Sequence, residues 1–186
     1  MKLLIMGPPG VGKGTQAKII KNELGIAHIS TGELLRYEIA KKTDIGSVAK
    51  KYIDHGKLVP DEYLFEIVRE RLNKPDCTNG YILDGFPRTL NQATGLEIIM
   101  DEYEQVLNKA ISLYADEDDL VERLVKRGED SGRSDDTSII IRNRQKIYWQ
   151  QTAPLLDFYN ERKLLNNING LGEIKEITNR ILSTLK

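Results

Sequence analysis

Cysteine is almost absent from this sequence. Cys77 is the only cysteine among 186 residues, which excludes a disulfide framework and a cysteine-rich structural zinc site. Charge of one sign is not in excess either, because 27 lysines and arginines face 28 aspartates and glutamates. Proteins that coat nucleic acid or an acidic membrane carry a large basic excess. We therefore expect neither partner, and any anion-binding site has to be local.

Long apolar runs are absent as well. The apolar stretch from Met1 to Met6 stops at a glycine-proline turn, far short of the roughly 20 residues that a membrane-spanning helix needs. No cleavage pattern of small residues follows it, and no proline-rich or serine-rich linker divides the chain. We expect one soluble, cytoplasmic domain over residues 1–186.

What the chain does contain is an alternation of strand and helix patterns. Short apolar runs predict strands at residues 3–6, 27–29, 80–85, 109–114 and 164–168. Helical spacing predicts helices at 13–24, 31–39, around 48–53, and at 61–72, 90–100, 118–127, 137–159 and 174–185. Residues 128–136 are expected to form a mobile surface loop, and Pro154 to kink or bound the long helix. This order predicts an α/β fold with a parallel five-stranded sheet and helices on both faces.

The most specific motif lies between the first predicted strand and helix. It reads Gly7-Pro8-Pro9-Gly10-Val11-Gly12-Lys13-Gly14-Thr15. Glycines let backbone N–H groups wrap phosphate oxygens, the helix N-terminus adds its positive end, and Lys13 supplies a point charge. We predict a nucleotide-phosphate cradle here, with a tight turn and an incidental lysine as the alternative. The general motif has serine or threonine directly after the lysine, whereas here Gly14 precedes Thr15.

A second candidate site follows the strand at residues 80–85. Asp84 is expected at its carboxyl end, where an open parallel sheet presents its ligand crevice. A carboxylate there can hold the water shell of a magnesium ion beside the phosphates, and a turn aspartate is the alternative. Arg88 would reach the same crevice and could grip a phosphate with two parallel hydrogen bonds.

Four arginines bracket the predicted loop. Arg123 and Arg127 share one helix face, Arg133 lies on the loop, and Arg144 lies on the facing helix. Phosphoryl transfer needs positive charge around the moving group, so we predict that these arginines converge on one cleft. Many acids lie in the same region, and a solvated, salt-bridged surface is the alternative. His28, His55 and Cys77 show no metal-ligand spacing, and we assign them no role.

Five blocks of sequence carry a resemblance to a known family. They are GPPGVGKGTQ at 7–16, STGELLR at 30–36, DGFPRT at 84–89, GRSDD at 132–136 and TAPL at 152–155. With these blocks in this order, the chain resembles the adenylate kinases over essentially its whole length. The resemblance implies a P-loop nucleotide kinase fold, a monomer, and reversible phosphoryl transfer from Mg-ATP to AMP that gives two ADP. It also accounts for Gly14, since nucleoside monophosphate kinases carry Gly-Lys-Gly-Thr at this point.

The resemblance further implies a core with two inserted parts, an acceptor segment at about 30–59 and a short lid at about 126–136. It implies that ATP is bound by Gly10, Val11, Gly12, Lys13, Gly14, Thr15, Arg127 and Gly172. It implies that AMP is bound by Thr31, Arg36, Lys57, Leu58, Val59, Gly85, Phe86, Pro87, Arg88, Gln92, Arg133 and Arg144. The catalytic residues would be Lys13, Arg88, Arg123, Arg133 and Arg144, with Asp84 holding Mg²⁺ through water. The lid lacks the cysteines that bind zinc in long-lid members.

The short lid does not determine the acceptor base, because short lids also occur in UMP/CMP kinases. By resemblance, Thr31 and Gln92 are the adenine-side choices. A glutamine amide can pair with both the donor and the acceptor on the edge of adenine, which favours AMP. The nearest alternative is a UMP/CMP kinase. A non-catalytic ATP-binding switch is a more distant one, and it leaves the predicted acceptor residues without a purpose.

Overall fold

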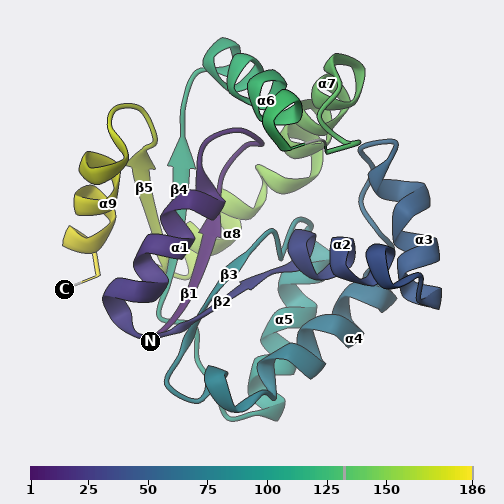
Figure 1. Ribbon diagram of the computed structural model, residues 1–186. Helices are drawn as coiled ribbons and strands as arrows, with labels where there is room; N and C mark the ends of the chain where they lie inside the picture. The colour runs from purple at the N-terminus through teal and green to yellow at the C-terminus, as the bar shows by residue number, and fades with distance from the viewer. Residues whose placement is uncertain (132, 186) are drawn as a thin grey trace.

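One parallel sheet organises the molecule. The computed structural model describes residues 1–131 and 133–185, without the side chains of residues 117, 118, 130 and 131, so Gly132 of the GRSDD block lies outside the described residues. The five strands are β1 (Lys2–Met6), β2 (Ala27–Ser30), β3 (Tyr81–Asp84), β4 (Lys109–Tyr114) and β5 (Leu165–Asn169). Their order across the sheet is β2-β3-β1-β4-β5, and every pair is parallel (Figure 1).

The central strand shows why helices cover both faces. Successive side chains of a strand point to opposite faces, and β1 is apolar at each of its buried positions. Leu4 and Met6 belong to a core cluster on one face, while Leu3 and Ile5 belong to a second cluster on the other. A strand with two apolar faces has to be covered twice, and the predicted α/β architecture is confirmed.

The two faces receive different helices. The face of Leu3 and Ile5 is packed by α1 (Lys13–Leu24) and α9 (Ile174–Ser183). The face of Leu4 and Met6 carries α2 (Thr31–Lys41), α3 (Asp44–Ile53), α4 (Asp61–Leu72), α5 (Leu90–Glu102) and α8 (Leu155–Glu161). A short 3₁₀ turn (Pro75–Cys77) leads into β3. Figure 1 shows α2 and α3 extending beyond the sheet, on the side away from α9.

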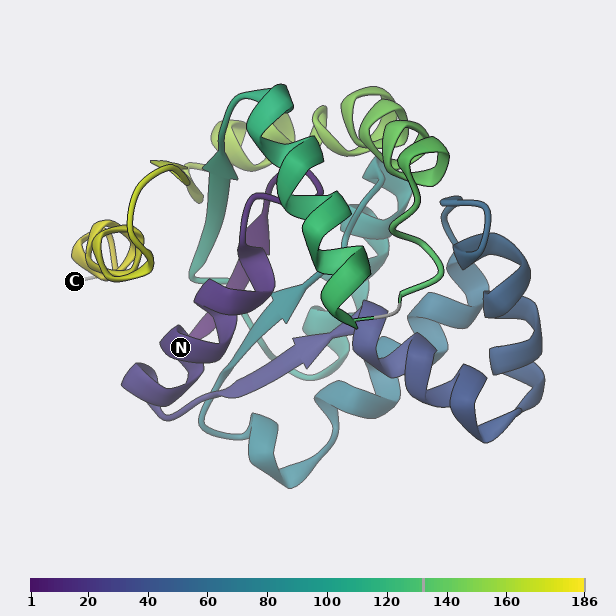
Figure 2. The same cartoon turned by 45° about the horizontal axis from the view of Figure 1, so that its top comes forward.

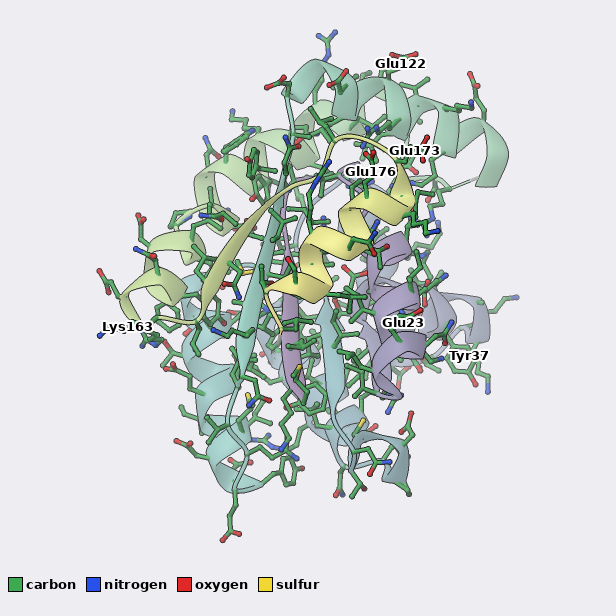
Figure 3. The ribbon with its side chains drawn as sticks, turned by 90° about the vertical axis from the view of Figure 1, so that its left-hand side faces the viewer. Glu23, Tyr37, Glu122, Lys163, Glu173 and Glu176 are labelled. Carbon is green, nitrogen blue, oxygen red and sulfur yellow. The ribbon has the colours of Figure 1, made fainter. Side chains whose placement is uncertain are left out.

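Helix α9 closes the end of the sheet nearest β5. It begins with a capping box, in which the Glu173 side chain accepts from the backbone N–H of Glu176 and the Glu176 side chain accepts from that of Glu173. Figure 3 looks onto this helix and labels both glutamates at its start. On its inner side, Ile177 and Ile181 bury the apolar face of the helix against the core.

Two of the predicted boundaries that differ from the structure lie near the cavity. Helix α6 (Glu117–Ser131) continues through Gly128, where the sequence predicts a loop. A β-carbon at Gly128 would lie 2.8 Å from the carbonyl oxygen of Asp136, so this glycine allows a close approach of the returning chain and does not end the helix. The predicted loop over 128–136 is therefore wrong in its first part.

The long helix predicted over 137–159 is also divided. It consists of α7 (Ser138–Ile147), a π-helical turn (Tyr148–Thr152) and α8. In that turn the N–H of Ala153 reaches back five residues to the carbonyl of Tyr148, at 2.8 Å, just before Pro154. The wider turn aims the hydroxyl of Thr152 at the carbonyl oxygen of Arg88, at 2.8 Å.

The α2–α3 segment and the α6–α7 connection meet above the sheet (Figure 2). The hydroxyl of Ser134 donates to Asp54 Oδ1 at 2.9 Å, and the side-chain amide of Asn143 donates to the carbonyl oxygen of His55 at 2.7 Å. These bonds join segments about 80 to 90 positions apart in the sequence. None of the helices in the described part of the chain combines the length and apolar character needed to cross a membrane.

Candidate active site

A cavity of about 380 Å³ lies at the carboxyl ends of the strands, between the phosphate loop, α2–α3 and the α6–α7 connection. This is the edge at which an open parallel sheet presents its ligand crevice. Most of the predicted site residues line it, namely Gly10, Gly12, Lys13, Gly14, Thr15, Thr31, Arg36, Lys57, Leu58, Val59, Asp84, Gly85, Arg88, Arg123, Arg127, Arg133 and Arg144. Residues from six separate stretches of sequence thus converge on one space.

Lys13 lies at the centre of the phosphate loop. Its ammonium donates to the carbonyl oxygens of Gly7, at 2.7 Å, and Pro8, at 3.0 Å. The pKa of Lys13 is lowered from its ordinary 10.5 to about 7, mainly by burial; the charge of Asp84 acts to raise it, and the charges of Arg88 and Arg144 act to lower it. Because burial makes the charged form of Lys13 less favourable, a phosphate bound nearby would stabilise that form.

Asp84 ends β3 and faces the phosphate loop. Burial raises the pKa of this carboxyl, but contact with His28 and the charge of Lys13 outweigh burial and hold it below the ordinary value. His28 Nε2 lies 3.6 Å from Asp84 Oδ2, and both side chains are largely buried. No sequence pattern singles out His28, because its proximity to Asp84 follows from the pairing of β2 with β3.

The Asp84 carboxylate suits a magnesium ion held through water. Magnesium keeps several waters and takes one or two protein carboxylates together with substrate phosphates. Asp84 Oδ2 lies 3.5 Å from the position of a β-carbon at Gly14, and so lies directly beside the phosphate loop. Among the side chains that the structure describes, no three of His, Cys, Asp or Glu are grouped to hold a metal among themselves, which a water-mediated site would not require.

Four arginines around the cavity have no acidic partner among the described residues. Arg36, Arg88, Arg123 and Arg133 form no ion pair with any residue in the described part of the chain. Burial, together with the charge of Arg133, lowers the pKa of Arg36. Burial, together with the charge of Arg144, lowers the pKa of Arg88 to about 10. Of the four arginines that bracket the predicted loop, Arg123 and Arg133 thus differ from the salt-bridged surface that was the alternative. Together with Arg36 and Arg88 they favour anionic ligands.

The other two arginines are held by acids of the α6–α7 connection. Arg127 donates from two nitrogens to the two carboxylate oxygens of Asp136, each at 2.7 Å. Arg144 contacts Asp136 Oδ1 at 2.6 Å and Asp135 Oδ2 at 2.9 Å. The Asp136 side chain is fully buried between them. The sequence suggested that these acids offset positive charge, but their role in fixing two arginines depends on the fold.

The turn after Asp84 folds back so that the Arg88 side chain contacts the backbone of Gly85. Phe86-Pro87 is a cis peptide, and Arg88 Nε donates to the carbonyl oxygen of Gly85 at 2.8 Å. Gly85 has φ of +84°, and a β-carbon there would lie 3.0 Å from the hydroxyl oxygen of Thr31 and 3.1 Å from the Arg88 guanidinium. Glycine at this position is what allows Thr31 and Arg88 to lie against the turn.

Five predicted site residues do not line the cavity. Val11 and Phe86 are buried, Gln92 is fully buried, Pro87 lines a smaller neighbouring cavity, and Gly172 lies on the loop between β5 and α9. Conversely, the sequence reading missed Lys18, Ser30, Glu33 and Asp135, which do line the cavity. Lys18 lies one helical turn after Gly14 and Thr15, a spacing that could have identified it. Its ammonium pairs with Glu33 at 3.2 Å.

A glycine-rich loop between the first strand and helix, at the carboxyl edge of a parallel sheet and surrounded by arginines, defines a P-loop nucleotide-binding protein. Comparison with known proteins agrees. The family model described as Adenylate kinase matches residues 5–164. The chain is similar to the adenylate kinase of Leptospira biflexa, with 48% identity over 184 residues and 99% of each chain covered. It is similar to that of Bifidobacterium longum, with 48% identity over 186 residues and both chains covered completely.

These matches extend well beyond the phosphate loop. The adenylate kinase of Stenotrophomonas maltophilia is also similar, with 45% identity over 186 residues and both chains covered completely. The chain belongs to the adenylate kinase family. It is thus a phosphotransferase of the nucleoside monophosphate kinase class, and the expected enzyme class is confirmed.

Proposed function

We propose that this chain transfers the terminal phosphoryl group of Mg-ATP reversibly to AMP, giving two ADP. The observation that carries this proposal is the set of four arginines without acidic partners in the described part of the chain, gathered with Lys13 around one cavity. A protein that only sensed ATP would need the phosphate loop alone. Arg36 and Arg88, which approach the cavity from the acceptor side, support a second phosphate-bearing ligand.

The reaction requires alignment and charge more than a general base. The acceptor oxygen belongs to a phosphate that is already largely ionised at neutral pH. Arg36 and Arg88 would orient this phosphate, while Lys13 and Arg123 would accompany the transferring group. Their charges stabilise the negative charge that spreads over the moving group and its neighbours in the transition state.

The metal site belongs to the same proposal. Asp84 would hold Mg²⁺ through its water shell beside the phosphates of ATP. When bound, the ion neutralises phosphate charge and draws electron density from the bridging oxygens. Thr15, exposed on the first turn of α1, lines the same part of the cavity.

Water has to be kept away from the transferring group. Arg133 and Arg144, on and beside the α6–α7 connection, would close over the phosphates, and the bonds from Ser134 to Asp54 and from Asn143 to the carbonyl of His55 would hold the closed arrangement. In this proposal residues 30–59 form the acceptor segment and 126–136 the lid. A cytoplasmic location and a monomeric state remain predictions.

Phosphorus-31 NMR of purified protein with ATP and Mg²⁺, with and without AMP, tests this function. We expect ATP and AMP to disappear together, with two ADP formed for each AMP consumed. ATP that binds without AMP-dependent turnover would favour the nucleotide-sensing switch. Turnover with UMP or CMP but not AMP would favour the pyrimidine kinase.

A further inference from the structure

Asp61, the first residue of α4, contacts the buried side chain of Gln92. The Gln92 side chain is fully buried, and its Nε2 donates to Asp61 Oδ1 at 2.7 Å. Its Oε1 accepts from the backbone N–H of Arg88, also at 2.7 Å. The Gln92 amide therefore connects the start of α4 to the backbone of a residue that lines the cavity.

These two partners allow the amide only one orientation. An ionised carboxylate accepts hydrogen bonds and cannot donate, and a backbone N–H donates and cannot accept. If the amide of Gln92 were reversed, its NH₂ would face the Arg88 N–H and its oxygen would face the Asp61 carboxylate. Both bonds would become repulsive contacts to the buried amide of Gln92, which is costly. Asp61 thus fixes the positions of the NH₂ group and the oxygen of the Gln92 amide.

The fixed orientation matters for a base. A primary amide has two donor hydrogens and two acceptor lone pairs, and Asp61 and Arg88 take one of each. The remaining donor and acceptor suit the edge of adenine, where a ring-nitrogen acceptor lies beside an amino donor. Uracil and guanine present the opposite order, a ring N–H beside a carbonyl. The reversed amide would match those bases instead.

We propose that Asp61 is a positioning residue that sets the base preference of the acceptor site by fixing the Gln92 amide. This proposal rests on the proposed function, in which Gln92 meets the acceptor base. Asp61 contacts no substrate itself in this account. Its second carboxylate oxygen accepts from the Nδ2 of Asn91. The Asn91 side chain is exposed and forms no hydrogen bond with the Gln92 side chain.

Steady-state kinetics of Asp61→Ala test the proposal. We expect the KM for AMP to rise about tenfold while the KM for ATP stays within about twofold, since the loss of a bond to a charged group acts on the acceptor side only. Turnover with UMP and GMP relative to AMP should increase. Asn91→Ala, which removes the other partner of Asp61, is the matched control and should keep both KM values and the base preference.

A double variant that exchanges the two side chains distinguishes a lost orientation of the Gln92 amide from general damage to the site. In Asp61→Asn, the introduced NH₂ has to face either the Gln92 or the Asn91 amide, so one donor is left against another. Adding Asn91→Asp supplies an acceptor, and the double variant should recover the AMP preference that the single variant loses. Equal KM increases for AMP and ATP, or a double variant no better than the single one, would overturn the proposal.

The hydrogen bond itself can be measured without substrate. NMR exchange of the Gln92 side-chain amide protons should be slow in the native protein and in Asn91→Ala, and much faster in Asp61→Ala. Unchanged exchange in Asp61→Ala would refute the role of Asp61 even if AMP proved not to be the acceptor. Slow native exchange with no AMP turnover would instead contradict the proposed function alone.

Discussion

The Lys13 ammonium lies 2.7 Å from the carbonyl oxygen of Gly7, so the phosphate loop is closed by a bond to its own lysine. Replacing Lys13 with alanine should lower kcat about 10²-fold or more, because a preorganised charge beside the transferring group is lost. Lys21→Ala on the same helix, an exposed lysine away from the cavity, should retain full activity. Near-native turnover in folded Lys13→Ala would refute the assignment.

The lowered pKa of Lys13 predicts proton uptake on ATP binding. At pH 8 a lysine with a pKa of about 7 is mostly neutral, and phosphate oxygens nearby should raise that pKa and charge it. Calorimetric titrations in buffers of different ionisation enthalpy should therefore show uptake approaching one proton, and less at pH 6. Lys13→Met should abolish the uptake. Binding heats that do not depend on the buffer would contradict this prediction.

Asp84 predicts a specific metal dependence. Removal of divalent cations with EDTA should abolish turnover, and added Mg²⁺ should restore it. Asp84→Asn keeps the size of the side chain but loses the charge that orders the water shell, so half-maximal activity should need several-fold more Mg²⁺. Glu33→Gln removes a different carboxylate from the cavity wall and serves as the control. A Mg²⁺ requirement unchanged in Asp84→Asn would exclude this residue from the metal site.

The Asp136 carboxylate should stabilise the folded protein at neutral pH and lose this effect in acid. Burial raises its pKa, but the bonds to Arg127 and the charge of Arg144 outweigh burial and hold it below the ordinary 3.8. The unfolded chain binds the proton more readily, so the stabilisation is complete above about pH 4 and is lost as the pH falls through the lower folded value. Asp136→Asn should cost about 2 kcal/mol at pH 7, since Arg127 is partly exposed, and reduce kcat.

Urea unfolding at pH 7 and at pH 3 measures this effect. The difference in stability between native protein and Asp136→Asn should shrink at the lower pH. Glu129→Gln, an exposed acid on the same helix, should show little change at either pH. A loss that is equal at both pH values would assign the effect of Asp136→Asn to packing and not to charge.

Most of the fold could be predicted from local pattern. The helices at 13–24 and 61–72 and the strand at 109–114 were predicted to the residue, because apolar spacing is regular there and glycine or proline bounds the two helices. Helix α6 was predicted to end too early, since the close approach of Asp136 to Gly128 is a tertiary contact. The π-helical turn was missed because Thr152 meets Arg88 through a bond between segments 64 residues apart.

The candidate site was likewise predicted only in part from the sequence. Residues of the phosphate loop could be identified because their chemistry lies in one continuous motif. His28 beside Asp84 and Asp135 beside Arg144 could not, since strand pairing and the return of the α6–α7 connection bring them together. Gln92 was identified by resemblance alone. Its bond to Asp61 depends on how α4 packs against α5, and its bond to the Arg88 backbone depends on the turn before α5.

The acceptor base is the central claim, and one assay tests it most directly. ADP formation should be followed with AMP, CMP, UMP and GMP in parallel, at equal concentrations and saturating Mg-ATP. The account predicts that AMP supports turnover at least about tenfold faster than UMP or GMP, because a base of the opposite hydrogen-bonding order leaves buried polar groups unpaired. A preference for CMP or UMP over AMP would contradict it.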